Sequence, residues 1–170
     1  MMTSADLQRF IDGHDIEAAI LPLSRPTPTV ADAAAVLGVA SIQVIKSLVF
    51  RIKEDPVLVI ANGESRIDRR KLADYLNVGR GRIRFASADQ AFDLTGYVVG
   101  SMPPFGHRLK LRTILDKAVT RQDEVYGGGG DINAMMRIKT SELLRITAGE
   151  TAAISCSQDS GDEPGRDRTD

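Results

Sequence analysis

A chain of 170 residues with 42% hydrophobic and 26% charged residues has the size and composition of one globular domain, and its core needs no metal or disulfide. A single cysteine excludes an internal disulfide and no apolar stretch is long enough to span a bilayer, so we expect a cytoplasmic protein without membrane contact. The net charge of −1 is not that of a protein that wraps duplex nucleic acid.

Local signals divide the first half of the chain into short helices and apolar strands. Capping residues predict where the helices begin, and glycines predict where they end. Runs of β-branched residues on both sides of a polar Lys-Glu-Asp-Pro segment predict a hairpin. In chain order we expect a helix capped by Ser4 and ended by Gly13, a strand over 17–21, a helix over 31–37 capped by Thr29, a helical turn over 41–45, and strands over 47–52 and 57–61.

The second half continues the same pattern of short elements. In chain order we expect a helix capped by Asp68, a half-exposed strand over 82–85, a helix capped by Ser87 and ended by Gly96, strands over 97–100, 112–116, 124–126 and 133–139, a helix capped by Thr140 or Ser141, and a strand over 152–154. Hairpin-linked strands with interspersed helices indicate an α+β fold with a mixed sheet. Residues 1–154 are predicted to form the domain, whereas the polar residues 155–170 are predicted to be disordered.

Three segments carry candidate chemistry. Lys46 is the one charged residue in the apolar run 44–50, where it either faces solvent or points into a pocket. Residues 100–107 combine glycines, which let backbone amides approach a ligand, with prolines, which stiffen the loop. The four glycines 127–130 either bring the backbone close to a ligand or form a flexible hairpin tip.

Several other kinds of site are missing from the sequence. It contains no cysteine and histidine cluster with zinc spacing, no phosphate-binding glycine motif that ends in Lys-Ser or Lys-Thr, and no dinucleotide fingerprint. It also lacks the Gly-x-Ser-x-Gly elbow of many serine hydrolases. We therefore expect neither a metal nor an organic cofactor.

With these segments in view, the chain resembles the YbaK/prolyl-tRNA synthetase-associated editing-domain family of free-standing aminoacyl-tRNA deacylases. The resemblance covers about residues 3–154 and rests on the segments QVIKSLVF, GYVVGSMPPFG, RTILD, VYGGGG and SELLRI. It implies a mixed, partly closed sheet with flanking short helices and a central cleft. It also implies trans-editing: hydrolysis of the ester that joins a small, wrong amino acid to a tRNA such as tRNA-Pro.

The resemblance assigns roles to individual residues. Lys46 becomes a catalytic residue of the pocket, where its ammonium would hold the substrate's α-carbonyl or terminal phosphate. The backbone amides of Gly100 and Ser101 become the catalytic donors that stabilise the oxyanion. An aminoacyl ester is already reactive, so positioning and these donors replace a side-chain nucleophile. The residues expected to bind substrate are Ser47, Met102, Pro104, His107, Gly128 and Gly129. Pro103 stands where family members have serine, a difference that bears on amino-acid specificity.

The expected partner is the 3′ end of an aminoacyl-tRNA, with an aminoacyl-tRNA synthetase as a further partner and a monomer or weak dimer as the assembly. Five arginines either receive the tRNA acceptor stem or form an ordinary solvated face; they are Arg66, Arg69, Arg70, Arg82 and Arg84. Two other functions remain open at this point: a non-catalytic RNA-binding or regulatory module that keeps the pocket, and an enzyme acting on a small free ester or amide.

Overall fold

The computed structural model describes residues 1–157, and residues 158–170 lie outside the described part of the chain. The helices in the described part are α1 (Ser4–Gly13), α2 (Val30–Leu37), α3 (Arg69–Leu76), α4 (Ala88–Thr95) and α5 (Thr140–Thr147), with 3-10 turns at Ser41–Gln43, Arg80–Arg82 and Val119–Arg121. The strands are β1 (Ala18–Pro22), β2 (Ile45–Ile52), β3 (Asp55–Asn62), β4 (Ser65–Ile67), β5 (Ile83–Phe85), β6 (Arg112–Asp116), β7 (Glu124–Gly128), β8 (Ala134–Lys139), β9 (Glu150–Ala152) and β10 (Ser155–Ser157).

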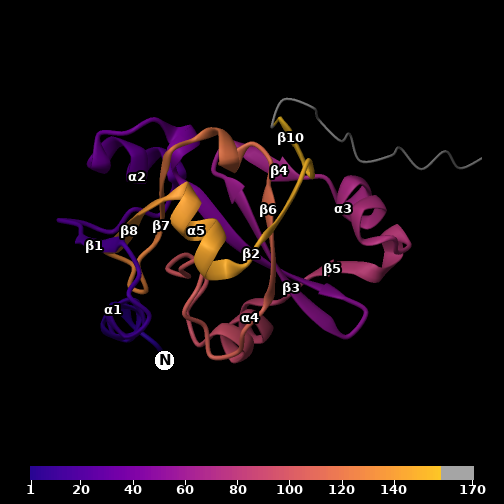
Figure 1. Ribbon diagram of the computed structural model, residues 1–170, viewed down its shortest axis with the longest axis horizontal. Coiled ribbons are helices and arrows are strands. Elements are labelled where there is room, and N and C mark those ends of the chain that lie inside the picture. Colours follow the sequence, from indigo (N-terminus) through magenta and orange to yellow (C-terminus); the bar gives the residue numbers. More distant parts are fainter. Residues whose placement is uncertain (158–170) are drawn as a thin grey trace, which may run out of the picture.

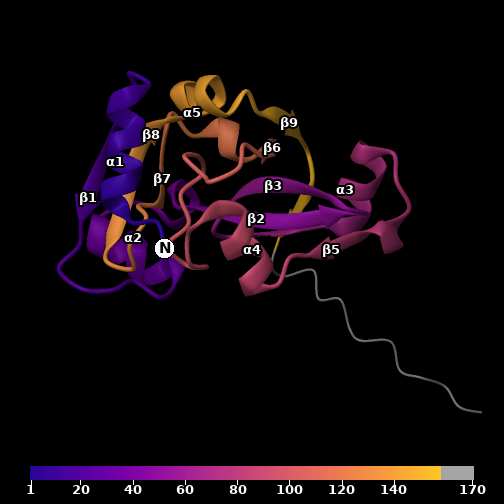
Figure 2. The same ribbon diagram turned by 90° about the horizontal axis from the view of Figure 1, so that it is seen from below.

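Two sheets form the body of the molecule. A five-stranded mixed sheet has the order β5-β2-β3-β6-β9, in which β6 runs parallel to both β3 and β9. A three-stranded antiparallel sheet, β1-β8-β7, lies beside it with α1 and α2 at that end of the molecule (Figures 1 and 2). A parallel bridge between Val44 and Tyr126 joins the two sheets without closing them. The predicted α+β class and mixed sheet are confirmed, and the partial closure is limited to this junction.

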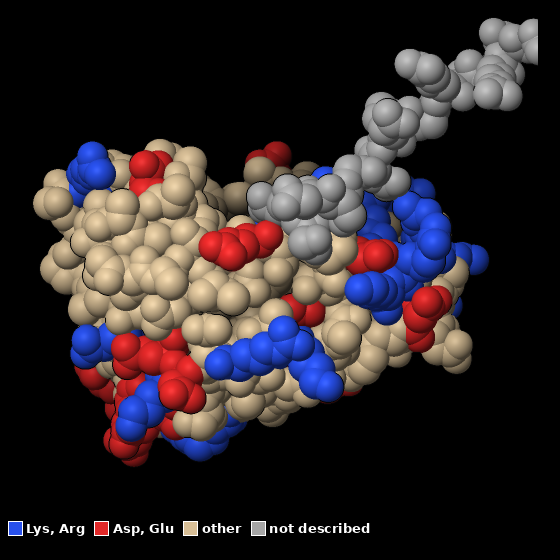
Figure 3. Space-filling view, turned by 90° about the horizontal axis from the view of Figure 1, so that it is seen from above, with Lys and Arg blue, Asp and Glu red and all other residues tan. Residues whose placement is uncertain are grey.

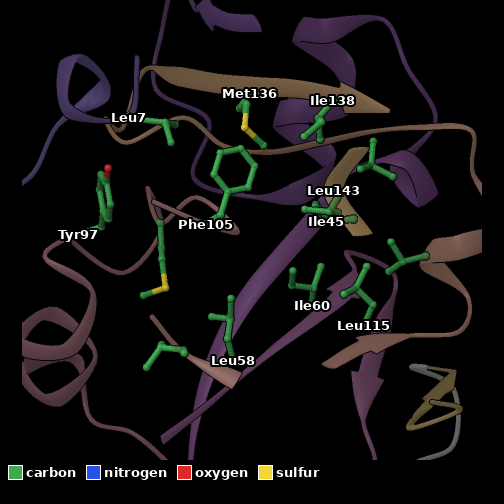
Figure 4. Close-up of a cluster of buried hydrophobic side chains, with 14 of the residues drawn as sticks. Leu7, Ile45, Leu58, Ile60, Tyr97, Phe105, Leu115, Met136, Ile138 and Leu143 are labelled. Carbon is green, nitrogen blue, oxygen red and sulfur yellow. The ribbon is translucent and has the colours of Figure 1, made fainter. Parts of the chain in front are cut away.

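The β2–β3 hairpin carries the core because both faces of its sheet are buried. Leu58 and Ile60 pack into the cluster shown in Figure 4, together with side chains from α1, β8 and α5. Val57 and Val59 point to the opposite face, where they pack with residues of α3 and β6. A strand buried on both faces has a continuous apolar sequence, which is why this hairpin was predicted at nearly its observed bounds.

Most helix ends follow the sequence signals, with two differences. Asp68, Ser87 and Thr29 cap their helices as predicted. Ser4 is instead the first residue of α1, and Thr3 precedes it with its N–H and hydroxyl donating to the Asp6 carboxylate at 2.7 and 3.1 Å. Thr140 does not cap α5, because its hydroxyl donates to the carbonyl of Gln122. No helix among residues 1–157 is long and apolar enough to cross a membrane.

A buried carboxylate holds the C-terminal end of the described chain. Asp116 is 1% exposed, and one of its oxygens accepts the N–H groups of Ile154 and Ser155 at 3.0 and 3.1 Å. Its other oxygen accepts the hydroxyl of Ser155 at 2.8 Å and the N–H of Ala118 at 3.1 Å. β10 also pairs with β4. Disorder predicted from residue 155 is therefore wrong for Ser155–Ser157, and the rest of that segment lies outside the described residues.

Replacing Asp116 with alanine is expected to lower the free energy of unfolding by about 3 kcal/mol, because one buried and two partly buried N–H groups lose their acceptor. Chemical denaturation measures the loss. Asp123→Ala is the matched control, since the Asp123 side chain is exposed and makes no hydrogen bond within residues 1–157. A similar, small loss in both variants would show that Asp116 does not hold the C-terminal strand.

Candidate active site

A cleft of about 250 Å³ opens where the two sheets diverge from the Val44–Tyr126 bridge. One wall is the first half of β2, and the other includes the end of β7 at Gly128. The loop that enters α2 and the loop after α4 complete the lining. The lining residues are Thr27, Pro28, Thr29, Val30, Ala33, Val44, Ile45, Lys46, Ser47, Leu48, Val99, Gly100, Met102, Gly128 and Met135.

The wall formed by β2 has a free backbone edge. The N–H of Gly63 donates to the carbonyl of Val44 at 2.7 Å, so even-numbered β2 residues pair with β3. The N–H of Ala86 donates to Val49 at 2.9 Å, so odd-numbered residues face the opposite edge. Because β5 pairs only with the far end of β2, the N–H and C=O of Ser47 are left facing the cleft. Ser47 therefore offers a donor and an acceptor to a ligand.

Lys46 lies beside Ser47 and lines the cleft as a half-buried side chain. Burial lowers the pKa of its ammonium, and the nearby positive charge of Arg66 lowers that pKa further. Within residues 1–157 no carboxylate lies within ion-pairing distance of Lys46. A partly desolvated cation without a protein counter-charge is suited to bind an anionic or carbonyl oxygen of a ligand.

The segment 97–100 forms a turn and not the predicted strand. The N–H of Ser101 donates to the carbonyl of Val98 at 3.1 Å, and Gly100 has φ of +98° at the position where a type II turn requires a positive value. The Ser101 hydroxyl also donates to Val98, at 3.0 Å. Gly100 therefore lines the cleft, as predicted, whereas Ser101 is buried with its amide engaged inside the turn. The predicted role of Ser101 as an oxyanion donor does not fit this geometry.

The glycine run packs closely against this turn. β7 continues through Gly128, and the N–H of Gly130 donates to the carbonyl of Ser101 at 2.9 Å. A Cβ on Gly128 would lie 2.7 Å from that same carbonyl oxygen, and a Cβ on Gly129 would lie 2.6 Å from the backbone of Ala134. Of the four glycines, Gly130 alone has a positive φ, at +95°. Close approach of the backbone, and not a left-handed conformation, therefore explains glycine at 128 and 129.

Two segments of the cleft lining have backbone amides that are not used in the neighbouring turn or ladder. The N–H of Gly129 pairs with Ala134 at 3.0 Å, so the alternation of an antiparallel ladder turns the N–H of Gly128 away from β8. The amides of Gly100 and Met102 donate to no protein acceptor within residues 1–157. The sequence predicted that Met102 binds substrate, and an amide without a protein acceptor is compatible with that role.

Comparison with known proteins identifies the family. The aminoacyl-tRNA editing domain family matches residues 24–146. The chain belongs to this family. The multifunctional Ser/Thr-tRNA deacylase ProXp-y of Escherichia coli K12 is 32% identical over 118 residues, which cover 66% of this chain and 70% of the deacylase. The proline–tRNA ligase of Thermodesulfovibrio yellowstonii is 31% identical over 98 residues, or 57% of this chain and 16% of the ligase.

A solved structure of a proposed trans-editing enzyme for prolyl-tRNA synthetase superposes with a TM-score of 0.82 at 28% identity. The superposition covers 91% of this chain and 97% of that one. Together with the sequence matches, it confirms the family predicted from the segments around Lys46 and the two glycine-containing loops. The cleft described above is therefore the candidate active site of an editing domain.

Three residues predicted to bind substrate in this editing domain lie outside the cleft lining. Gly129 and Pro104 are buried behind it. His107 hydrogen-bonds through Nε2 to the carbonyl of Pro103 at 2.7 Å, and burial lowers the pKa of its imidazole, which favours the neutral form as the N–H donor. His107 thus stabilises the loop. Pro103 is buried and does not line the cleft, so its missing N–H removes no donor from it.

The described part of the editing domain offers no obvious metal centre. Residues 1–157 contain no group of three or more His, Cys, Asp or Glu side chains arranged to hold an ion. The cleft is lined by a lysine, by glycines that leave backbone exposed, and by apolar side chains. Such a set can bind a carbonyl or phosphate oxygen and exclude bulky groups, and both abilities bear on the hydrolysis of an ester.

Proposed function

We propose that this protein is a trans-editing deacylase that hydrolyses the ester between a small, wrong amino acid and its tRNA. The observation that supports the proposal is that Lys46, Gly100 and Gly128 line one cleft. Membership of the aminoacyl-tRNA editing domain family supports it. The likeness to ProXp-y, a Ser/Thr-tRNA deacylase, and to proline–tRNA ligases supports a small amino acid carried by tRNA-Pro or a similar tRNA.

The proposed reaction needs positioning and charge stabilisation. Lys46 holds the terminal phosphate or the ester carbonyl of the aminoacyl-tRNA by charge-assisted hydrogen bonds. Water attacks the carbonyl carbon and loses a proton as the new carbon–oxygen bond forms. The amides of Gly100, Met102 and Gly128 stabilise the oxyanion that develops. The bond between the carbonyl carbon and the ribose oxygen then breaks, and the ribose oxygen takes up a proton. One water molecule is consumed, and the products are a free amino acid and an uncharged tRNA.

The size and polarity of the cleft support selection of a small amino acid. Its volume of about 250 Å³ lies below the ~300–1,000 Å³ of pockets that take drug-sized ligands. Val30, Ala33 and Met135 provide an apolar wall. A larger side chain would meet this wall, so the cleft would admit small residues and reject large ones, in the way that an editing site sorts by size.

The decisive experiment is hydrolysis of a panel of tRNAs charged with serine, threonine, alanine, cysteine or proline. We expect catalysed release of at least one small amino acid from the tRNA. Tight binding of tRNA without release of any amino acid would support the alternative of a non-catalytic RNA-binding module. Equal turnover of a free amino acid ester, without dependence on the tRNA, would instead indicate a general esterase.

We also infer that the protein acts in the cytoplasm, because aminoacyl-tRNAs are made and used there. An aminoacyl-tRNA synthetase that releases mischarged tRNA is a natural second partner. For the assembly, a monomer or a weak dimer stays a prediction, which size-exclusion chromatography with light scattering tests.

A further inference from the structure

A second and larger hollow, of about 410 Å³, lies beyond the other end of β2. The tip of the β2–β3 hairpin, the segment that enters β5 and the side of α4 form its walls. It is strongly basic, and we name it the basic groove. Its principal lining residues are Arg51, Lys53, Arg82, Arg84, Phe85 and Gln90.

The positive charges of the basic groove are poorly balanced within the protein. Arg51 and Arg84 are directly opposite each other in the β2–β5 pairing, an arrangement of like charges that destabilises a sheet. Glu54 is the one acid among the described lining residues, and it pairs with Arg51 at 2.7 Å as a side chain that is 91% exposed. Arg82 and Arg84 have no acidic partner within residues 1–157. An anionic ligand would offset this repulsion.

An exposed aromatic ring lies among these cations. Phe85 is 49% exposed, its ring packs on Phe50 with centroids 4.2 Å apart, and the guanidinium of Arg69 lies 5.1 Å from its centroid. Aromatic and guanidinium planes beside a basic groove are typical of surfaces that bind single-stranded nucleic acid, because bases stack on them while the cations contact phosphates. Figure 3 shows that lysines and arginines also gather around the end of the molecule that carries α3.

The basic groove and the cleft lie along the same strand. Arg51 follows Lys46 by five residues on β2, which is about 17 Å of extended chain. A few nucleotides of single-stranded RNA span that distance. The edge of β2 thus connects a site suited to an ester with a site suited to a phosphate backbone.

We propose that the basic groove binds phosphates of the acceptor end of the tRNA whose charged 3′ terminus enters the cleft. This inference rests on the proposed deacylase function and adds a location for the RNA. It also gives a location to three of the five arginines predicted to receive the acceptor stem. Arg82 and Arg84 contact phosphates and Arg69 offers a stacking surface, while Arg51 and Lys53, which sequence reasoning overlooked, complete the groove.

The test compares Arg84→Glu with Arg121→Glu, because both arginines are exposed and Arg121 lies in a 3-10 turn that does not line the groove. For a mischarged tRNA we expect Arg84→Glu to raise KM about tenfold at nearly constant kcat, and Arg121→Glu to change neither. For an aminoacyl ester of adenosine, which has no RNA body, both variants should match the parent protein. For uncharged tRNA, the slope of log Kd against the logarithm of the salt concentration should be smaller by about 0.7 in Arg84→Glu. This is the change expected from the loss of one phosphate contact on a single strand.

Two outcomes distinguish a failure of the groove proposal from a failure of the deacylase proposal. If the parent protein hydrolyses mischarged tRNA and Arg84→Glu has the KM and salt dependence of Arg121→Glu, the groove does not bind the tRNA and the deacylase function still stands. If no substrate is hydrolysed, the deacylase function fails, and the Kd of uncharged tRNA still decides whether the groove binds RNA. An unchanged Kd in Arg84→Glu overturns the inference in either case.

Discussion

Replacing Lys46 with alanine is expected to lower kcat/KM for a mischarged tRNA by about 100-fold or more, the effect typical of removing a preorganised donor from a developing oxyanion. The fold should survive, because Lys46 is a half-buried cation without an ion pair in the described chain and its desolvation opposes folding. Single-turnover hydrolysis measures the activity, and a thermal melt measures the stability. Lys110→Ala, at an exposed position outside the cleft, is the matched control.

The pH dependence gives an independent signature of Lys46. Because burial lowers its pKa below the ordinary 10.5, activity that requires the ammonium should fall with rising pH earlier than an exposed lysine would allow. The free energy of unfolding should change in the opposite direction. Between the lowered pKa of Lys46 and 10.5, this residue binds more protons in the unfolded chain than in the folded protein. The contribution of Lys46 to the free energy of unfolding therefore rises with pH over this range. Lys46→Ala should remove that rise. Wild-type activity in this variant would exclude Lys46 from the reaction.

Replacing Gly128 with alanine is expected to lower kcat/KM sharply and also to destabilise the fold by about 1–3 kcal/mol, the range for overpacking. The added Cβ would lie 2.7 Å from the carbonyl oxygen of Ser101, which is backbone and cannot rotate away. Either the turn that presents Gly100 moves or β7 moves, and both movements displace donors of the cleft. Activity divided by the folded fraction, which circular dichroism measures, separates this loss from simple unfolding.

Gly127→Ala is the matched control for Gly128→Ala. A Cβ at Gly127 meets the side chain of Ile45 at 3.3 Å, and a side chain can shift by a few tenths of an ångström. We therefore expect Gly127→Ala to retain most activity. If Gly128→Ala lost stability but kept full turnover in the folded fraction, β7 would support the cleft without supplying a donor to the ester.

The local parts of the fold were predictable from the sequence, and the long-range parts were not. A capping box such as Ser87 with Gln90 involves residues three apart, so the signal and the contact coincide. The turn at Gly100 also depends on Gly130, whose N–H bonds to the far end of that turn, and no local pattern reveals such a pairing. Two valines before a glycine favour a strand on propensity alone, which explains the wrong prediction for 97–100.

The same distinction applies to the candidate site. Lys46 and Ser47 lie in a segment whose residues identify the family, and the structure places both in the cleft lining. Ser101 was assigned a catalytic role together with Gly100 on the strength of the resemblance, but its amide donates to the carbonyl of Val98 inside the turn. The basic groove joins Arg51 with Arg84, and only the β2–β5 register brings these two residues together. Sequence identifies chemical groups, whereas strand pairing decides which of them share a surface.

The Asp116 carboxylate has a consequence for the order in which the chain folds. It accepts hydrogen bonds from Ser155, which lies 39 residues further along the chain, so this contact requires nearly all of the described chain to have been synthesised. Long-range contacts of this kind form late, because the chain entropy lost in closing the loop must first be offset by other packing. During translation, Asp116 at the end of β6 would therefore stay open to water until Ile154 and Ser155 can reach it. The Asp116 contact therefore forms only after residues 154 and 155 have emerged from the ribosome.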